Sequence, residues 1–128
     1  MRNFKTTVAP LLIGMAMFYL AGCEYDEILP PPPPDQVSFS VDIVPIFNQS
    51  CNIAGCHSGT AGFVPDLTSA NAYNSLIEGN YIDTITPDNS LLYRWMTGKE
   101  GVSMPPDGTN SFYNATVLKW IEQGALEN

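Results

Sequence analysis

The fold of this chain is organised around residues 51–57, which read CNIAGCH. Four residues separate Cys51 from Cys56, and His57 follows directly. Residues five apart in a continuous helix point about 140° apart, so two thiols at this spacing share one site only if the chain bulges or loops between them. Gly55 permits such a loop. His57 is the only histidine in the chain, which excludes a His–His metal pair and any catalytic triad that needs a second histidine.

Three kinds of site are compatible with these residues. Covalent c-type haem attachment uses two cysteines followed directly by a histidine, usually with two residues between the cysteines rather than four. The thiols can then add to the haem vinyl groups, and the histidine is placed to ligate the iron. A Cys51–Cys56 disulfide suits an oxidising compartment but leaves His57 unexplained. Zinc could use the same three side chains but lacks an obvious fourth soft ligand. We rank haem first, the disulfide second and zinc last.

A methionine downstream could supply a sixth ligand to iron. Electron-transfer haem is often held by His and Met. Beyond residue 22 the chain has two methionines, Met96 and Met104. Met96 lies on the apolar face of an expected helix, which favours a core role. Met104 precedes two prolines in a glycine-flanked loop, residues 101–108, and a rigid loop can project a side chain into a pocket at little entropic cost. We therefore predict Met104 as the distal ligand; the alternative is a partly exposed loop methionine.

The N-terminal residues predict an export signal. Arg2 and Lys5 precede a run of 13 mostly apolar residues, 8–20. This run is too short to span a bilayer comfortably and has the layout of a secretory signal. It ends in LAGC, residues 20–23, which resembles the lipobox of bacterial lipoproteins. The resemblance implies cleavage before Cys23 and lipidation of Cys23, hence a lipid anchor in a bacterial membrane, outside the cytoplasm, on the periplasmic face or cell surface. The alternative is an uncleaved, weakly hydrophobic anchor.

The chain divides into three parts on this interpretation. Residues 1–22 form a lipoprotein signal peptide, residues 23–36 an acidic and proline-rich linker, and residues 37–128 the folded domain. Pro30 to Pro34 are five consecutive prolines, which favour a stiff polyproline II spacer. We expect the linker to pack against nothing.

The charge balance excludes several classes of partner. Residues 23–128 contain all 13 acidic residues but only three of the five basic ones, so their net charge is 3 − 13 = −10, against −8 for the whole chain. Binding to nucleic acid and electrostatic binding to anionic lipid both need a basic patch, so the acidic balance argues against both partners. At this length one domain is the limit, and Rossmann or barrel enzymes are excluded.

Four short helices and no convincing strand are expected in residues 37–128. Each has a polar capping residue and an apolar face, and three have a glycine as a stop signal. The first helix has Asp42 as its cap and Ile43, Ile46 and Phe47 on its apolar face. The second starts at Thr68 or Ser69 and stops at Gly79, with Tyr73, Leu76 and Ile77 on its face, and the third starts at Asp88 or Asn89 and stops at Gly98, with Leu92, Trp95 and Met96 on its face. The last starts at Asn114 and stops at Gly124, with Val117, Leu118 and Ile121 on its face. Helices this short are marginal alone, so a disulfide, a metal or a bound cofactor is expected to complete a small core.

Residues 41–128 resemble the class I monohaem cytochrome c domain found on bacterial lipoproteins. The resembling elements run in family order: residues 43–47 (IVPIF), Cys56-His57, Asp66-Leu67, residues 90–93 (SLLY), Met104-Pro105 and residues 120–125 (WIEQGA). The resemblance implies an all-α fold of about four short helices with long loops around one haem c. It implies covalent links from Cys51 and Cys56, with His57 and Met104 as the axial iron ligands. Plausible wall residues, from the helix faces, are Phe47, Leu67, Leu92, Trp95, Leu118 and Ile121.

The predicted function is a membrane-tethered electron carrier rather than an enzyme. A His/Met pair fills both axial positions of iron, which leaves no open site for a substrate. Its partners would be redox proteins, and a charge of −10 favours those with basic docking patches. Two alternatives come from other classes: a haem peroxidase or gas-binding enzyme with an open sixth position, and a haem-free, disulfide-bonded surface lipoprotein that acts as a binding module.

Overall fold

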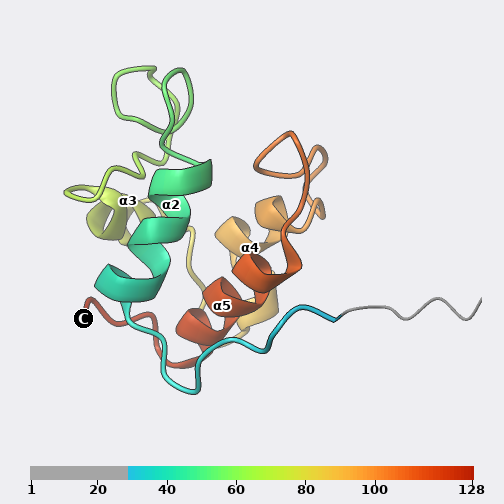
Figure 1. Ribbon diagram of the computed structural model, residues 1–128. Helices are drawn as coiled ribbons and strands as arrows, with labels where there is room; N and C mark the ends of the chain where they lie inside the picture. Colours follow the sequence, from blue (N-terminus) through green and yellow to red (C-terminus); the bar gives the residue numbers. More distant parts are fainter. Residues whose placement is uncertain (1–28) are drawn as a thin grey trace, which may run out of the picture.

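A computed structural model of the chain describes residues 29–128. The predicted signal peptide and Cys23 lie outside this range. The regular elements, in chain order, are η2 (Phe39–Ile43), α2 (Val44–Ser50), α3 (Ala72–Glu78), η3 (Pro87–Asn89), α4 (Leu91–Met96) and α5 (Ser111–Glu122). The described residues contain four α-helices and no strand, so the predicted all-α class is confirmed (Figure 1). Across the same residues, no helix combines the length and apolar character needed to cross a membrane.

The first helical segment begins earlier than the sequence predicted. Asp42 was the expected cap, but the helix starts at Phe39 as a π-helical turn, and Ser38 is its cap. The Ser38 hydroxyl accepts a hydrogen bond from the Val41 amide (3.4 Å), and the Asp42 carboxylate accepts one from the Ser38 amide (2.7 Å). The two bonds resemble the reciprocal bonds of a capping box, with the acidic residue one position later than usual, so Asp42 supports the cap formed by Ser38.

The boundaries of the other helices also differ from the predicted ones by about one turn. α5 begins at Ser111 because Asn110 caps it, accepting a hydrogen bond from the Tyr113 amide (3.0 Å). α3 begins at Ala72 rather than at Thr68 or Ser69, although the Thr68 carbonyl accepts the Ala72 amide (2.8 Å). α4 begins at Leu91, after a separate 3₁₀ turn. Gly79, Gly98 and Gly124 do follow the ends of three helices, as predicted.

Aromatic rings join the first and last helices at the centre of the core. The Phe39 ring lies 5.2 Å from Trp120, 5.3 Å from Tyr73 and 6.4 Å from Phe47, measured between centroids. Trp120 is buried, and its indole N–H donates to the Leu126 carbonyl (2.9 Å). Such pairs add to the burial of apolar area, which is the main stabilising term in a small domain. The sequence analysis had not assigned Phe39 or Trp120 to the core.

Two of the predicted helix faces were partly wrong. Leu76 on α3 is fully buried, but the adjacent Ile77 is 43% exposed. On α5, Val117 and Ile121 are fully buried, while Leu118 is only half-buried. Ala72 on α3 is also fully buried, although the predicted apolar face did not include it.

α2 and α5 run in opposite directions, so the end of one lies beside the start of the other (Figure 1). At one end of the pair, the Tyr113 hydroxyl donates to Gln49 Oε1 (2.7 Å). At the other end, the Phe39 amide donates to Asn128 Oδ1 (2.8 Å). The loop of residues 51–65 and the loop of residues 101–110 therefore leave α2 and enter α5 at the same end of the domain.

The described part of the linker, residues 29–36, contacts the domain at Asp35, contrary to the expectation that the linker packs against nothing. The Gln123 side chain donates to the Asp35 carbonyl (2.7 Å) and accepts a hydrogen bond from the Val37 amide (3.0 Å). Val37 is buried in the core cluster. The start of the domain is thus fixed to the end of α5 on both sides of residue 36.

The contrast between Leu76 and Ile77 predicts a large difference in their contributions to stability. We expect Leu76→Ala to lower the free energy of unfolding by about 2–5 kcal/mol, because it opens a cavity in the core. The neighbouring Ile77→Ala should cost less than about 1 kcal/mol, since that side chain is largely solvated. Urea unfolding of both variants under identical conditions measures this difference. Equal costs would contradict the packing of α3 described above.

Candidate functional site

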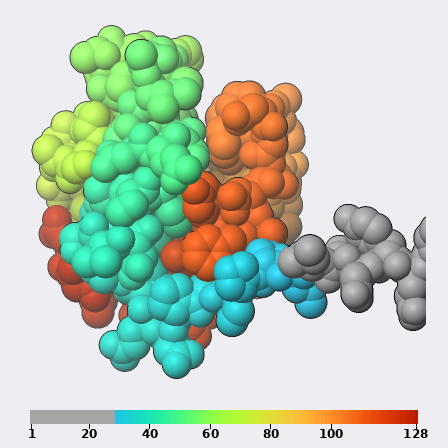
Figure 2. Space-filling view, in the orientation of Figure 1, coloured from blue at the N-terminus to red at the C-terminus, as the bar shows by residue number. Residues whose placement is uncertain are grey.

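An apolar cavity of about 470 Å³ lies at the end of the domain where α2 stops and α5 starts. Figure 2 shows the molecular surface hollowed between the green segment of residues 51–65 and the orange loop near residues 100–108. Its volume is in the range typical of ligand and cofactor sites. No Asp, Glu, Lys or Arg is among the lining residues, which are Ser50, Cys51, Gly55, Cys56, His57, Phe63, Val64, Pro65, Leu67, Tyr81, Leu91, Leu92, Trp95, Met96, Met104, Pro105 and Pro106.

The CNIAGCH segment forms the loop that its spacing requires. Cys51 follows the last turn of α2, and its amide donates to the Phe47 carbonyl (2.9 Å). The chain then turns through Gly55, whose φ of 84° is in the left-handed region that favours glycine. The His57 amide returns to donate to the Cys51 carbonyl (3.1 Å). This closed loop places Cys51, Cys56 and His57 on one wall of the cavity.

The surroundings of His57 orient its ring. Its Nδ1 lies 2.9 Å from the Pro65 carbonyl oxygen, which can only accept a hydrogen bond. In the neutral imidazole, the form that binds metals, this contact places the proton on Nδ1 and the lone pair on Nε2. Histidines that bind metals almost always donate their other ring N–H in this way, which orients the ring and raises the basicity of the ligating nitrogen. The Leu67 amide also donates to the His57 carbonyl (2.8 Å), so two hydrogen bonds close the loop from His57 to Leu67.

The two cysteines are free, half-buried thiols. Burial raises the pKa of Cys51 to about 11, and the nearby Cys56 adds to the shift because two thiolates repel each other. The Cys51 thiol therefore keeps its proton near neutral pH, and its thiolate reactivity is suppressed. Both sulfurs remain available to a group that occupies the cavity.

Met104 reaches the cavity on a loop that is tied to the end of α4. Its amide donates to the Trp95 carbonyl (2.9 Å), and the residue is half-buried. Met96, which had been assigned to the core, is indeed in the core cluster but also lines the cavity. Both methionines therefore border the same space as His57.

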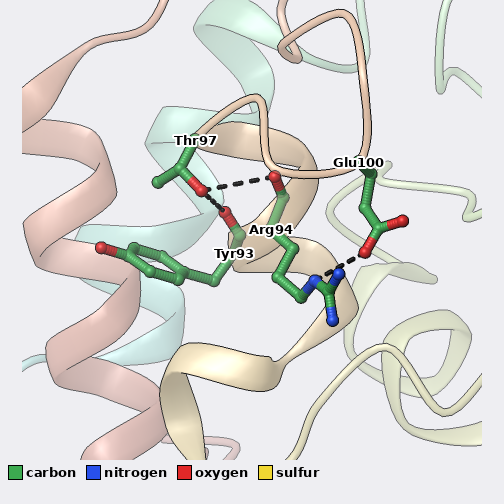
Figure 3. A network of polar contacts seen from close by, with 4 residues as sticks. All are labelled: Tyr93, Arg94, Thr97 and Glu100. Atoms are coloured by element: carbon green, nitrogen blue, oxygen red, sulfur yellow. Dashed lines mark hydrogen bonds and ion pairs between the residues drawn. The ribbon is translucent and has the colours of Figure 1, made fainter.

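A small polar network fixes the turn between α4 and the Met104 loop (Figure 3). The Thr97 hydroxyl lies 2.8 Å from the Tyr93 carbonyl and 3.3 Å from the Arg94 carbonyl, at the C-terminal end of α4. Arg94 Nε forms an ion pair with Glu100 Oε1 (2.6 Å) across the same turn. The ion pair is partly exposed and contributes little energy, so its effect is to orient the turn.

Asp66 anchors the segment that follows the cavity loop. Its carboxylate accepts hydrogen bonds from the Thr68 amide and hydroxyl and from the Asn71 side chain. These bonds stabilise the ionised form and hold the pKa of Asp66 below its usual value. Gly59 lies against the same carboxylate, where an added Cβ would be 2.7 Å from Asp66 Oδ2. The loop therefore closes on itself only with glycine at this position.

Half of the predicted wall residues border the cavity. Leu67, Leu92 and Trp95 do, but Phe47 and Ile121 lie in the core, and Leu118 is outside the lining set. The helix faces could not separate the core from the cavity wall, because both are apolar. The sequence analysis missed several wall residues in loops, which have no periodicity to reveal them: Phe63, Val64, Tyr81, Pro105 and Pro106.

The cavity brings together Cys51, Cys56, His57 and Met104, the four residues that the sequence predicts for a haem site. Within residues 29–128, no group of three or more His, Cys, Asp or Glu side chains is placed to hold a metal ion. Comparison with known protein families, with curated proteins and with solved structures found no match.

The lowered pKa of Asp66 predicts a pH-dependent contribution to stability. A carboxyl whose folded pKa lies below 3.8 stabilises the fold above that pH, and the contribution is lost as the pH falls through the folded pKa. We expect Asp66→Asn to lower the urea midpoint at pH 6, and to differ less from wild type at pH 3. A difference between the two proteins that does not depend on pH would contradict this role of the carboxylate.

Proposed function

We propose that this chain is a membrane-tethered, monohaem c-type cytochrome that carries single electrons between redox proteins. The observation that carries the proposal is that two thiols, an imidazole and a thioether converge on one uncharged, apolar cavity. The sequence by itself predicts the same four residues.

The residues present fit this cofactor. An apolar wall suits a large, flat, mostly apolar ring system, and thiol, imidazole and thioether groups are the c-type attachment and ligand set. The His57 Nδ1–H bond to Pro65 leaves Nε2 as the ligating atom. Haem c, when bound, supplies reversible one-electron chemistry at iron.

Each residue has a separate task on this proposal. Cys51 and Cys56 would hold the haem covalently through their sulfurs. His57 and Met104 would ligate its iron. With two protein ligands on the iron there would be no place for a substrate, which favours a carrier over a peroxidase or a gas-binding enzyme.

Absorption spectra of the full chain test the proposal. The chain is expressed in a bacterium with cytochrome c maturation and extracted in detergent. We expect a low-spin spectrum on reduction, and haem that stays on the chain under denaturing, thiol-reducing conditions, because the thioether bonds are covalent. A His57→Ala variant should lose the low-spin spectrum.

Two results would contradict the proposal. A colourless, folded protein would favour the disulfide-bonded lipoprotein, provided that a known cytochrome matures in the same cells. A high-spin spectrum would favour an enzyme with an open sixth position.

Paired methionine variants test the distal ligand. We expect Met104→Leu to remove the weak long-wavelength band of methionine bound to ferric iron and to lower the reduction potential, since methionine ligation raises it. Met96→Leu is the matched control and should keep both properties, because it is a volume-conserving change in the core. The reverse pattern would assign the ligand to Met96.

A further inference from the structure

The cavity and the linker lie at opposite ends of the domain. Residues 39–50, which comprise η2 and α2, separate the linker junction from Cys51, and twelve helical residues span about 18 Å. α5 runs back over a similar length, from the cavity end to Gln123, which holds the linker. In Figure 1 the linker, drawn in cyan to blue, crosses the lower part of the domain and leaves it at the right-hand side, while the loop after Cys51 lies at the top.

Hydrogen bonds fix the direction in which the linker leaves. Gln123 binds the backbone of Asp35 and Val37, and Asn128 binds the amides of Phe39 (2.8 Å) and Ser40 (2.8 Å). The five prolines before Asp35 continue the linker from this junction for about 15 Å if they adopt polyproline II. A stiff spacer on a fixed junction restricts rotation of the domain about its anchor.

The rim of the cavity is apolar and exposed. Phe63 and Val64 line the cavity and are 60% and 76% exposed. Ile53 (50% exposed) and Val102 (67% exposed) are not lining residues, but they lie in the two loops that contribute to the lining. Large side chains with this exposure at the mouth of a site mark an interaction surface when they are contiguous.

The acidity of the chain does not extend to this rim. Residues 51–65 and 101–106 contain no Asp, Glu, Lys or Arg, although residues 23–128 have a net charge of −10. The acids that adjoin these segments are Asp66, whose carboxylate is tied to Thr68 and Asn71, Glu100, which pairs with Arg94, and Asp107. A basic patch placed on this rim would lose hydration without gaining an opposite charge.

We propose that the cavity mouth is the docking face for a redox protein that presents an apolar, uncharged patch, and that this partner approaches from the side away from the membrane anchor. The inference rests on the proposed function and names the partner chemistry of that same site. The net charge alone predicted a partner with a basic docking patch. We replace that expectation with an apolar partner patch, because residues 51–65 and 101–106 carry none of the acidic side chains. Docking of this kind is nearly independent of salt, since no ion pairs form at the contact.

Electron exchange with small inorganic complexes measures the charge at the mouth. The haem-loaded full chain in detergent reacts with an anionic complex, hexacyanoferrate, or a cationic one, hexaammineruthenium. We expect each rate to change less than about twofold between roughly 0.1 M and 1 M salt, where the Debye length is about 10 Å or shorter and distant charges of the domain are screened. Phe63→Asp or Ile53→Asp should make both rates salt-dependent in opposite directions. Val41→Asp adds the same charge at the linker end, on a residue that is 70% exposed, and should behave like wild type.

Two outcomes would overturn the docking face while leaving the proposed function intact. If wild type already shows a salt dependence of about tenfold or more, the field of the whole protein governs encounter. If wild-type protein sediments as a dimer that Phe63→Asp disrupts, the rim binds a second copy of the chain instead. Both are read on protein whose haem spectrum is normal, so they are distinct from a failure to bind haem.

The orientation is tested without any haem signal. A fluorophore is placed at position 41 or at position 60 of the lipidated full chain, by an unnatural amino acid, in vesicles that contain an acceptor lipid. We expect greater energy transfer to the membrane from position 41 than from position 60, which lies in the exposed cavity loop. Gln123→Ala should reduce the difference, because it frees the linker junction. Equal transfer from both positions in the wild-type chain would overturn the orientation.

Discussion

The structure depends on how the chain closes the loop between Cys51 and Leu67. Two backbone hydrogen bonds, from the His57 amide to the Cys51 carbonyl and from the Leu67 amide to the His57 carbonyl, return the chain to the end of α2. The imidazole of His57 completes the closure through Pro65. Each bond contributes only about 1 kcal/mol, but together they hold one wall of the cavity in a segment that has no helix. If this loop opened, the three residues that face the cavity would separate.

The apolar interior of the domain is divided between a packed core and a cavity wall. The core joins the first and last helices through Phe39 and Trp120, near the end where the linker leaves. The wall lies at the other end, where loops contribute more of the lining residues than helices do. On the proposed function, a covalently held haem covers this wall and adds apolar contacts that four short helices do not supply, so that cofactor binding also stabilises the fold. On the same proposal, this division separates the linker junction from the surface at which electrons would be exchanged.

The sequence by itself determined the features that depend on neighbours along the chain. Cysteine spacing required a loop, which forms at Gly55 as expected, and glycines follow the helices where they were predicted. Cys51, Cys56, His57 and Met104 could be chosen from the sequence because few other side chains in the chain have their chemistry. The all-α class followed from capping residues and helical periodicity, which are local signals as well.

Only the tertiary structure decided what depends on contacts between distant segments. Ser38 and Asp42 are both good caps, and the helix starts at Ser38, where Asn128 binds the adjacent Phe39 amide from the far end of the chain. Periodicity placed Leu76 and Ile77 on one face, but packing buries only Leu76. The core, the cavity wall and an exposed rim all have apolar side chains, so hydropathy cannot distinguish them. Their roles are set by which faces the loops bring together, because burial is a property of the folded arrangement and not of any residue alone.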